Sequence, residues 1–208
     1  MPGEDEPGEA ELRRADLASD PLLQFRDWFA EASAALDVPE AMALATASAE
    51  GAPSVRMVLL KGIDERGLVF FSHYTSRKGP ELEANPQAAL LFHWSPLGRQ
   101  VRVEGTVERV SEVESDAYFA TRPRGAQVGA VASRQSDRLG SRAELYERLA
   151  ELEDDLAGGA VPRPPTWGGF LLVPRAWEFW QHRESRLHDR FRYEREPTGG
   201  WRADRLFP

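Results

Sequence analysis

The sequence predicts a mainly β protein with flanking helices (α+β), built around a small antiparallel β-barrel. Three observations predict this class: many short apolar or alternating segments, turn residues between them, and few stretches with helical periodicity. Short strands closed by a few helices are typical of a barrel rather than a parallel sheet. The chain lacks a glycine-rich dinucleotide fingerprint, which argues against a Rossmann domain.

The first elements follow in order along the chain. Residues 1–18 are rich in Gly, Pro and Glu, and we expect a disordered acidic tail there. Asp20-Pro21 predicts a helix start, and apolar residues at helical spacing continue to Leu36. Apolar or alternating runs separated by turn residues then predict strands at 42–47, 54–60 and 68–72.

The second half begins with a short helix after Ser76. Strands are predicted at 88–94 and 100–110, and the latter alternates clearly between apolar and polar residues. Residues 111–156 have a helical pattern, in which Ser141 and Glu144 form a capping box. Beyond a Gly- and Pro-rich linker, the predicted strands are 169–173, 177–181, 187–194 and 201–206.

Size and charge limit the possible functions. The 208 residues suit a single domain, residues 19–208, and the net charge of -8 argues against a general nucleic-acid binder. The apolar runs are too short to cross a membrane, and no secretory signal is evident, so we expect a cytoplasmic protein. Without cysteine there is no disulfide or thiolate chemistry. The four histidines lack metal-ligand spacing, so no metal site is expected.

Small basic clusters in this acidic chain suit a compact anionic ligand. Arg77 and Lys78 lie where a strand ends and a helix begins, which favours a phosphate cradle, although such helix starts are also common on ordinary surfaces. Arg56 and Lys61 would point to opposite faces of a regular strand. They could serve two different anions, or one could face water, and the spacing does not decide between these.

The segment Arg186-Leu187-His188-Asp189-Arg190 is the most suggestive. An extended chain would place Arg186, His188 and Arg190 on one face, where they would repel one another without an anionic partner. A bound phosphate or an acidic cofactor would supply that partner. The alternative is a solvent-facing edge strand whose charges deter aggregation.

Taken together and in order, these segments resemble the pyridoxamine 5'-phosphate oxidase family. The similarity runs from about Leu12 to Pro208. It is carried by several short segments: 56–61, 76–78, 99–101, 118–124, 133–136, 167–169, 178–181, 186–190 and 204–208. The resemblance implies an FMN-binding split β-barrel that works as a homodimer, with FMN at the subunit interface.

The resemblance also implies an activity and a set of site residues. The activity is oxidation of pyridoxamine or pyridoxine 5'-phosphate to pyridoxal 5'-phosphate, with dioxygen as acceptor and hydrogen peroxide as product. The implied catalytic residues are Arg186 and His188, and both would also contact the substrate together with Lys61, Tyr118 and Arg122. The implied FMN contacts are Arg56, Met57, Val58, Leu59, Lys61, Phe71, Ser72, Arg77, Lys78, Gln100, Gln135, Ser136, Trp180 and Arg190.

Some positions depart from the family pattern. Ala126 stands where a serine is usual, and His182 stands where a glycine usually follows Trp-Gln. The family's N-terminal Arg-Arg-Glu-Tyr stretch has no clear counterpart. These departures leave open a related FMN oxidase of another aromatic substrate, as in phenazine biosynthesis. A non-catalytic split-barrel protein that binds flavin or pyridoxal phosphate is a further alternative, as is a deazaflavin-dependent reductase, which fits the Arg77-Lys78 and Gln135-Ser136 pairs less well.

Overall fold

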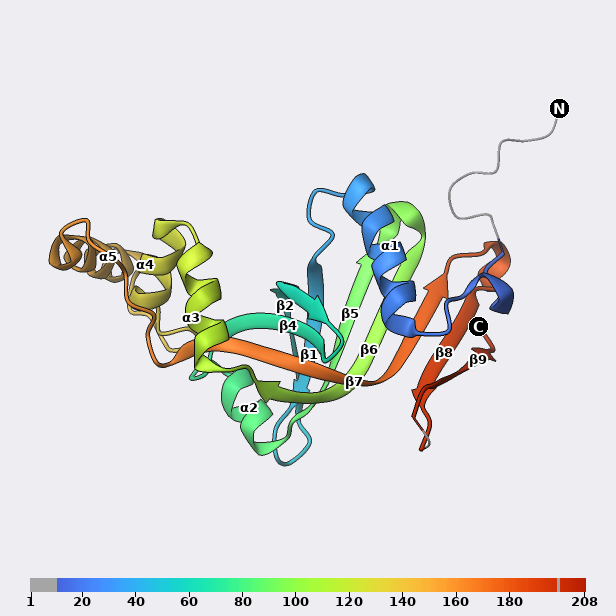
Figure 1. The fold of residues 1–208 in the computed structure, drawn as a ribbon. Coiled ribbons are helices and arrows are strands. Elements are labelled where there is room, and N and C mark those ends of the chain that lie inside the picture. Colours follow the sequence, from blue (N-terminus) through green and yellow to red (C-terminus); the bar gives the residue numbers. More distant parts are fainter. Residues whose placement is uncertain (1–10, 198) are drawn as a thin grey trace.

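One antiparallel sheet of nine strands forms the centre of the computed structural model, which describes residues 11–197 and 199–208 (Figure 1). The strands are β1 (Ala41–Ala47), β2 (Pro53–Leu59), β3 (Gly62–Asp64), β4 (Gly67–His73), β5 (Gln87–Trp94), β6 (Arg99–Arg109), β7 (Trp167–Gln181), β8 (Asp189–Arg195) and β9 (Trp201–Leu206). Their order is β2-β1-β5-β6-β7-β4-β3, with β8 on β7 and β9 on β8. The predicted mainly β class with flanking helices is confirmed.

The sheet curls until its two ends approach each other. Strand β2, at one end of the order, contacts β4 near the other end. Just after β2, the backbone N–H of Lys61 donates to the carbonyl of Val69 at 2.8 Å, which holds the two ends together. The largest hydrophobic core fills the inside of the curl, where Met42, Leu44 and Phe92 are fully buried.

Strand β7 is the longest strand of the sheet and pairs with β6, β4 and β8. It also corrects the prediction of two separate strands in this part of the chain. The segments 169–173 and 177–181, predicted as two strands, are one strand of 15 residues. Pro174 lies opposite Gly105, where the β6–β7 register shifts. Proline lacks an N–H, and this bulge accommodates it without ending the strand. Before the bulge the second edge of β7 pairs with β4, and after it with β8, so the sheet splits here.

Helix α1 (Pro21–Ala35) begins where the sequence predicts. The Asp20 side chain accepts a hydrogen bond from the Leu22 N–H at 2.8 Å, and Pro21 occupies the first turn. Its buried face packs on the core: the Phe25 ring lies 4.9 Å from Phe92 and 5.4 Å from Trp177. The aromatic stripe of this helix is therefore part of the core.

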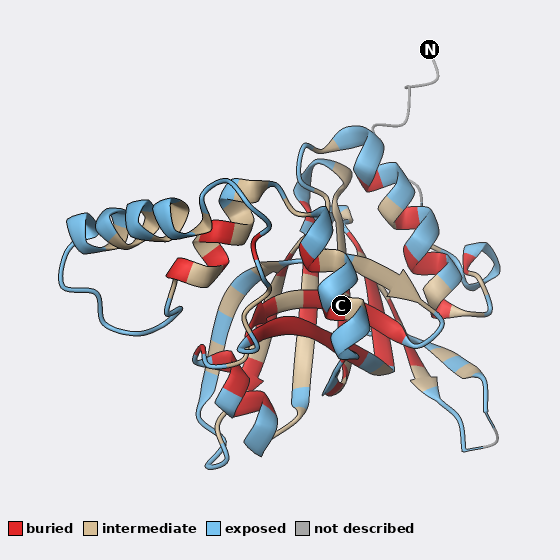
Figure 2. Cartoon of the chain, turned by 60° about the vertical axis from the view of Figure 1, so that its left-hand side comes forward, coloured by how far each residue is buried: buried red, intermediate tan, exposed pale blue. Residues whose placement is uncertain are grey.

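The remaining helices are α2 (Lys78–Ala84), α3 (Glu112–Thr121), α4 (Arg124–Ala132) and α5 (Arg142–Leu156). They match the short helix predicted after Ser76 and the helical region 111–156, and Pro123 separates α3 from α4. Helix α5 packs on α4 and has no buried residue, as its pale blue surface in Figure 2 shows. In the described part of the chain, no helix is both long and apolar enough to span a membrane.

The start of β8 corrects a second prediction. The strand expected from Leu187 begins at Asp189, and the preceding residues form a short 3-10 turn, η3 (Glu184–Arg186). Ser185 and Arg186 have φ values of 55° and 61°, which are incompatible with an extended strand. Arg186, His188 and Arg190 therefore do not alternate along one strand. The short β3 was also missed, since its three residues carry no periodicity.

The predicted N-terminal tail is described only in part, because residues 1–10 lie outside the described residues. From residue 11 onward the chain contacts the end of the sheet. The Leu12 N–H donates to Asp189 at 3.0 Å, Leu17 is buried, and the Tyr193 hydroxyl donates to the Ala18 carbonyl at 2.7 Å. Residues 11–18 thus pack against β8 and the largest hydrophobic core.

Candidate functional site

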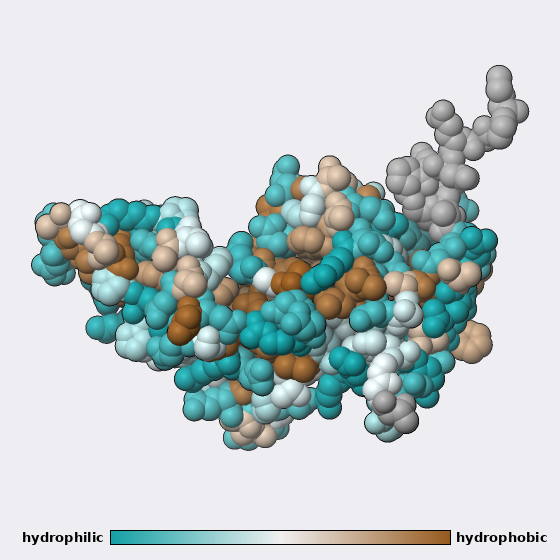
Figure 3. Space-filling model, in the orientation of Figure 1, coloured by the Kyte–Doolittle hydropathy of each residue, from teal (hydrophilic) through white to brown (hydrophobic). Residues whose placement is uncertain are grey.

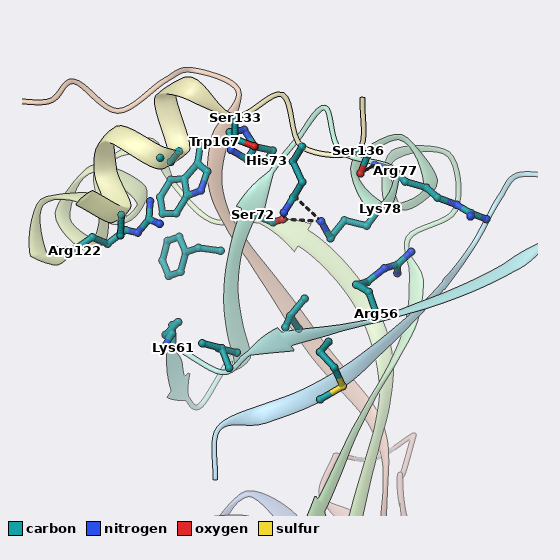
Figure 4. A pocket seen from close by; sticks show the side chains of 18 of the residues that line it. Arg56, Lys61, Ser72, His73, Arg77, Lys78, Arg122, Ser133, Ser136 and Trp167 are labelled. Atoms are coloured by element: carbon teal, nitrogen blue, oxygen red, sulfur yellow. Dashed lines mark hydrogen bonds between the residues drawn. The ribbon is translucent and has the colours of Figure 1, made fainter. Parts of the chain in front are cut away.

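A cavity of about 800 Å³ opens between the curled sheet and the helices α2, α3 and α4 (Figure 4). Five cationic side chains line it: Arg56, Lys61, Arg77, Lys78 and Arg122. Among the described residues, no aspartate or glutamate lines this cavity. Such an excess of positive charge suits an anionic ligand, because charge-assisted contacts from Arg and Lys are strong.

Lys78 lies at the centre of the first basic group, beside Arg56 and Arg77. It is buried, and its Nζ donates to the hydroxyls of Ser72 and Ser76, both at 2.8 Å, and to Oε1 of Gln135 at 2.9 Å. Burial and then the nearby Arg56 charge lower the pKa of Lys78 to about 8, although Glu81 opposes this. Lys78 is therefore still mostly protonated at neutral pH, but it loses its proton at a lower pH than an ordinary lysine.

Glu81 supports this group from behind, and sequence reasoning missed it. Its carboxylate pairs with Arg77 at 2.9 Å and with Arg56 at 3.1 Å. Burial raises the pKa of Glu81, but hydrogen bonds from Ser54, Thr46 and the two arginines outweigh burial and lower it to about 2. Glu81 thus stays ionised and fixes both guanidinium groups. The i,i+4 spacing of Arg77 and Glu81 on α2 was the available signal.

The second basic group contains Arg122 and Lys61, which lie away from the first group in Figure 4. The Arg122 guanidinium lies 4.7 Å from the centre of the Trp167 ring, and burial lowers its pKa. Its Nη1 is buried without a hydrogen-bond partner in the described part of the chain. A buried donor without a partner is unfavourable, so we infer that this N–H donates to an acceptor on a ligand.

An aromatic wall lies beside this second group. The Tyr118 ring stacks on Phe71 at 3.9 Å and lies parallel to Trp167, 6.2 Å away. Trp167 and the buried His73 also line the cavity, and neither was assigned to the site from the sequence. Burial, then the charges of Lys78 and Arg122, lower the pKa of His73. Because these residues are apolar or buried, nothing in the local pattern distinguished them from core residues.

Strand β2 forms the apolar rim of the cavity. Val55, Met57 and Leu59 are exposed, with 70%, 65% and 40% of their surface accessible, whereas Arg56 turns toward the interior. Apolar surface gathers in the hollow near β2 in Figure 3. The strand ends at Leu59, so strand alternation does not extend to Lys61, and both Arg56 and Lys61 line the same cavity. The two cations therefore face one cavity rather than opposite sides of a strand.

The structure brings thirteen of the eighteen predicted site residues to this cavity. They are Arg56, Met57, Val58, Leu59, Lys61, Phe71, Ser72, Arg77, Lys78, Tyr118, Arg122, Gln135 and Ser136. The other five lie on β6, β7, β8 and the loop before β8, outside the cavity lining. They are Gln100, Trp180, Arg186, His188 and Arg190.

The second set is also organised. Gln100, Trp180 and Arg190 are direct neighbours across β6, β7 and β8. The Trp180 ring lies 4.5 Å from the ring of His188, and Arg190 pairs with the buried Glu178 at 2.8 Å. One chain therefore holds two separate groups of predicted site residues. No group of three or more His, Cys, Asp or Glu residues able to hold a metal occurs in the described ranges.

Comparison with protein families identifies two matching regions. Residues 29–154 match the family model described as pyridoxamine 5'-phosphate oxidase. Residues 167–208 match the model described as the pyridoxine 5'-phosphate oxidase C-terminal dimerisation region. The second region contains β7, β8, β9 and the loop with Arg186 and His188.

Curated relatives are similar over nearly the whole chain. A pyridoxine/pyridoxamine 5'-phosphate oxidase from Rubrobacter xylanophilus is 60% identical over 204 residues, covering 95% of this chain and 94% of that protein. One of the same name from Cupriavidus taiwanensis is 58% identical over 198 residues, covering 95% and 93%.

Solved structures share the fold. PhzG from Burkholderia lata, in complex with tetrahydrophenazine-1-carboxylic acid, superposes with a TM-score of 0.90 at 37% identity, covering 97% of this chain and all of that one. A pyridoxamine 5'-phosphate oxidase-related, FMN-binding protein from Nostoc punctiforme gives a TM-score of 0.72 at 16% identity, covering 92% and 100%. The second likeness concerns the fold alone.

Proposed function

The chain belongs to the pyridoxamine 5'-phosphate oxidase family, and from this premise we propose how its residues bind FMN and substrate. It is an FMN-dependent pyridoxine/pyridoxamine 5'-phosphate oxidase. One observation carries the assignment of roles: the cavity has five cations, no carboxylate among its described lining residues, and a buried Arg122 Nη1 without a partner. Two phosphorylated ligands account for this surplus of donors.

The first basic group holds the FMN phosphate in this proposal. Arg56 and Arg77 are fixed by Glu81, and Lys78 is fixed by Ser72 and Gln135, so these donors are already ordered before a ligand arrives. Preordered donors lose little conformational entropy on binding. The apolar side chains of Met57, Val58 and Leu59 and the ring of Phe71 suit a flat heteroaromatic ring, and Ser136 suits the polar chain between ring and phosphate.

The second basic group holds the substrate phosphate. Lys61, Tyr118 and Arg122 supply two cations and a hydroxyl, and the aromatic wall beside them suits a pyridine ring. Nη1 of Arg122 has no hydrogen-bond acceptor in the described chain. Its burial is therefore unfavourable until a bound anion accepts a hydrogen bond from it. The two groups face one cavity, so FMN and substrate would lie next to each other.

A second copy of the chain completes the site. Five of the predicted site residues lie outside their own chain's cavity lining: Gln100, Trp180, Arg186, His188 and Arg190. They belong to the region that matches the C-terminal dimerisation region or pair with it directly. We therefore propose a homodimer in which each loop around His188 covers the other copy's cavity, with FMN at the interface.

In the proposed reaction, the protein positions the substrate and manages its proton. When bound, FMN supplies the two-electron acceptor for oxidation of the 4'-carbon and the reaction with dioxygen that releases hydrogen peroxide. Nδ1 of His188 accepts the Arg183 N–H at 3.1 Å, so a neutral ring carries its proton on Nε2. In this proposal Nε2–H donates to the substrate, and Arg186 adds a positive charge beside it. Both residues orient the pyridine ring, and the Arg186 charge favours loss of the amine or alcohol proton to solvent.

An absorbance spectrum of the purified protein tests this proposal. We expect a yellow dimer whose flavin absorbance bleaches when pyridoxamine 5'-phosphate is added without oxygen and returns with air, with hydrogen peroxide formed. A folded protein that stays colourless in excess FMN would contradict the cofactor site. A yellow protein that never bleaches would support a non-catalytic flavin binder instead.

A phenazine-type substrate is the second candidate. The superposition on PhzG favours it, as does Ala126, whose methyl group lines the cavity where a hydroxyl is expected. Identity of 60% to the vitamin-phosphate oxidase exceeds the 37% to PhzG, and Arg122 needs an anion. Oxygen consumption with each substrate class distinguishes the two. Faster turnover of the phenazine precursor would overturn the first assignment.

A further inference from the structure

Three aromatic rings meet at the end of β7 and the loop that follows it. The His188 ring lies 4.5 Å from Trp180 and 5.2 Å from His182, and the Trp180 and His182 rings are 6.0 Å apart. The contacts are tilted, with interplanar angles of 40° to 53°. The three rings therefore form a triangular cluster, in which His188 contacts both the tryptophan and the second imidazole.

The backbone fixes where His182 stands. Its N–H donates to the carbonyl of Gly98 at 2.7 Å, and its Cβ lies close to Gly98, where an added methyl group would come within 3.0 Å. Gly98 has a φ of 59°, a conformation that favours glycine. His182 is exposed, so this anchoring is not explained by core packing. Its ring has a defined place that does not depend on burial.

We propose that His182 is a positioning residue for His188, completing with Trp180 a ring cluster that confines His188 to one orientation and one neutral tautomer. The Arg183 N–H already binds Nδ1 at 3.1 Å and favours the proton on Nε2. That single hydrogen bond leaves the ring free to tilt about it, and contacts with two neighbouring rings restrict this freedom. The inference rests on the role proposed above for His188.

The electrostatics agree with the geometry. Burial, then His182 and Arg186, lower the pKa of His188. Arg183 and Arg190 are further cations near it in the chain, and their charges are balanced by Asp189 at 3.7 Å and by Glu178 at 2.8 Å. Since protonation of one imidazole disfavours protonation of the other, His182 helps keep His188 neutral. A neutral ring is the form in which the Nδ1 acceptor and the Nε2–H donor coexist.

Two substitutions separate ring contact from charge. H182A removes both, whereas H182F keeps a ring against His188 but cannot be protonated. The measurement is histidine-selective ¹⁵N NMR of the FMN-loaded protein without substrate, which reports the tautomer of His188 and its pKa. Flavin content, FMN affinity and thermal stability check that each variant is folded.

In wild type we expect the Nε2–H tautomer to dominate. In H182A we expect mixed tautomers, a raised pKa of His188 and kcat lower by about tenfold with unchanged FMN affinity. In H182F we expect the wild-type tautomer and most of kcat, with a smaller rise in pKa. The acidic limb of the kcat profile should move to higher pH in the order wild type, H182F, H182A.

The outcomes decide between a positioning role and none. A wild-type tautomer and pKa in H182A would overturn the proposal, and so would an H182F variant that behaves like H182A, because ring contact would then be irrelevant. The NMR result does not depend on turnover. If the His188 tautomer responds as expected but no vitamin phosphate is oxidised, the proposed function fails while this inference stands.

Discussion

Arginines serve opposite purposes in two regions of this protein. On the outer face of β6, β7 and β8, three arginines meet three glutamates in a charge ladder, defined as Arg102, Glu104, Glu178, Arg190, Arg192 and Glu194. Five ion pairs connect them, and each arginine contacts a carboxylate. In the cavity, the ion pairs between described residues give the five cations two carboxylates, Glu81 and Glu40, and the latter is 3.7 Å from Lys61.

The difference teaches how to tell structural charges from ligand-binding charges. In the ladder every arginine is paired with a carboxylate, so these charges do not require a ligand, although Arg102 Nε lacks a hydrogen bond and Arg190 also belongs to the proposed site. In the cavity, Arg122 Nη1 has no acceptor, and burial of Lys78 lowers its pKa and so destabilises its charged form. Protein stability alone does not favour either feature, since unpaired buried donors and cations are destabilising. An excess of positive charge that faces a cavity therefore indicates a binding site for an anionic ligand.

The largest expected effect lies in the loop between β7 and β8. H188A and R186M should each lower kcat by about 100-fold or more, because groups that orient the substrate contribute on this scale, while FMN stays bound. Steady-state oxygen consumption and flavin absorbance measure the two properties. The loop variant E184Q is the matched control and should keep wild-type turnover. Unchanged kcat in both H188A and R186M would remove the catalytic assignment.

Arg122 tests whether the surplus charge binds substrate. R122M removes the unpaired donor and should raise KM for pyridoxamine 5'-phosphate by about 30-fold, as charge-assisted hydrogen bonds are worth about 2 kcal/mol. FMN affinity should change little. Thermal stability should not fall, because the substitution removes a buried cation that has an unsatisfied donor and is itself destabilising. R142M, on the exposed helix α5, controls for net charge. Weakened FMN binding with an unaltered KM would instead assign Arg122 to the cofactor.

Most of the fold was predictable from local pattern. Helix α1, with its Asp20-Pro21 start, and the alternating strand β6 lie where periodicity placed them. The exceptions depend on tertiary pairing. β7 continues through Pro174 because Gly105 opposite permits a bulge, and β8 starts late because Ser185 and Arg186 adopt positive φ. Neither fact can be read from the residues on one strand alone.

The cationic residues of the site could be predicted from the sequence, but the residues that hold them in place could not. Arg77 and Lys78 were visible at the end of a strand, whereas Glu81, which orders Arg56 and Arg77, lies one helical turn further and resembles a surface glutamate. Trp167 reads as an ordinary core residue. The division of the predicted residues into two groups depends on the third dimension, and only the structure reveals it.

Lys78 should make FMN binding in the cavity depend on pH. Its pKa of about 8 in the free protein should rise when a phosphate dianion binds, so FMN binding takes up a proton between the two values. FMN affinity should therefore weaken as pH rises above about 8, by up to about tenfold per pH unit. Fluorescence titration of the apoprotein with FMN measures this. K78R, whose charge persists, should flatten the profile, and an unaltered slope in K78R would identify another group.

The charge ladder should give the smallest effect. Hydrogen bonds from Arg192, outweighing burial, lower the pKa of Glu104. A carboxylate with a depressed folded-state pKa stabilises the protein above its unfolded-state value, and this contribution is lost as pH falls through the folded-state pKa. E104Q should therefore reduce the free energy of unfolding at neutral pH by less than about 1 kcal/mol, and the difference should vanish in acid and shrink in high salt. Urea denaturation across pH measures it, with E147Q on α5 as the control. A ladder variant that loses FMN or turnover more than stability would break the distinction, because balanced charges would then also serve the ligand.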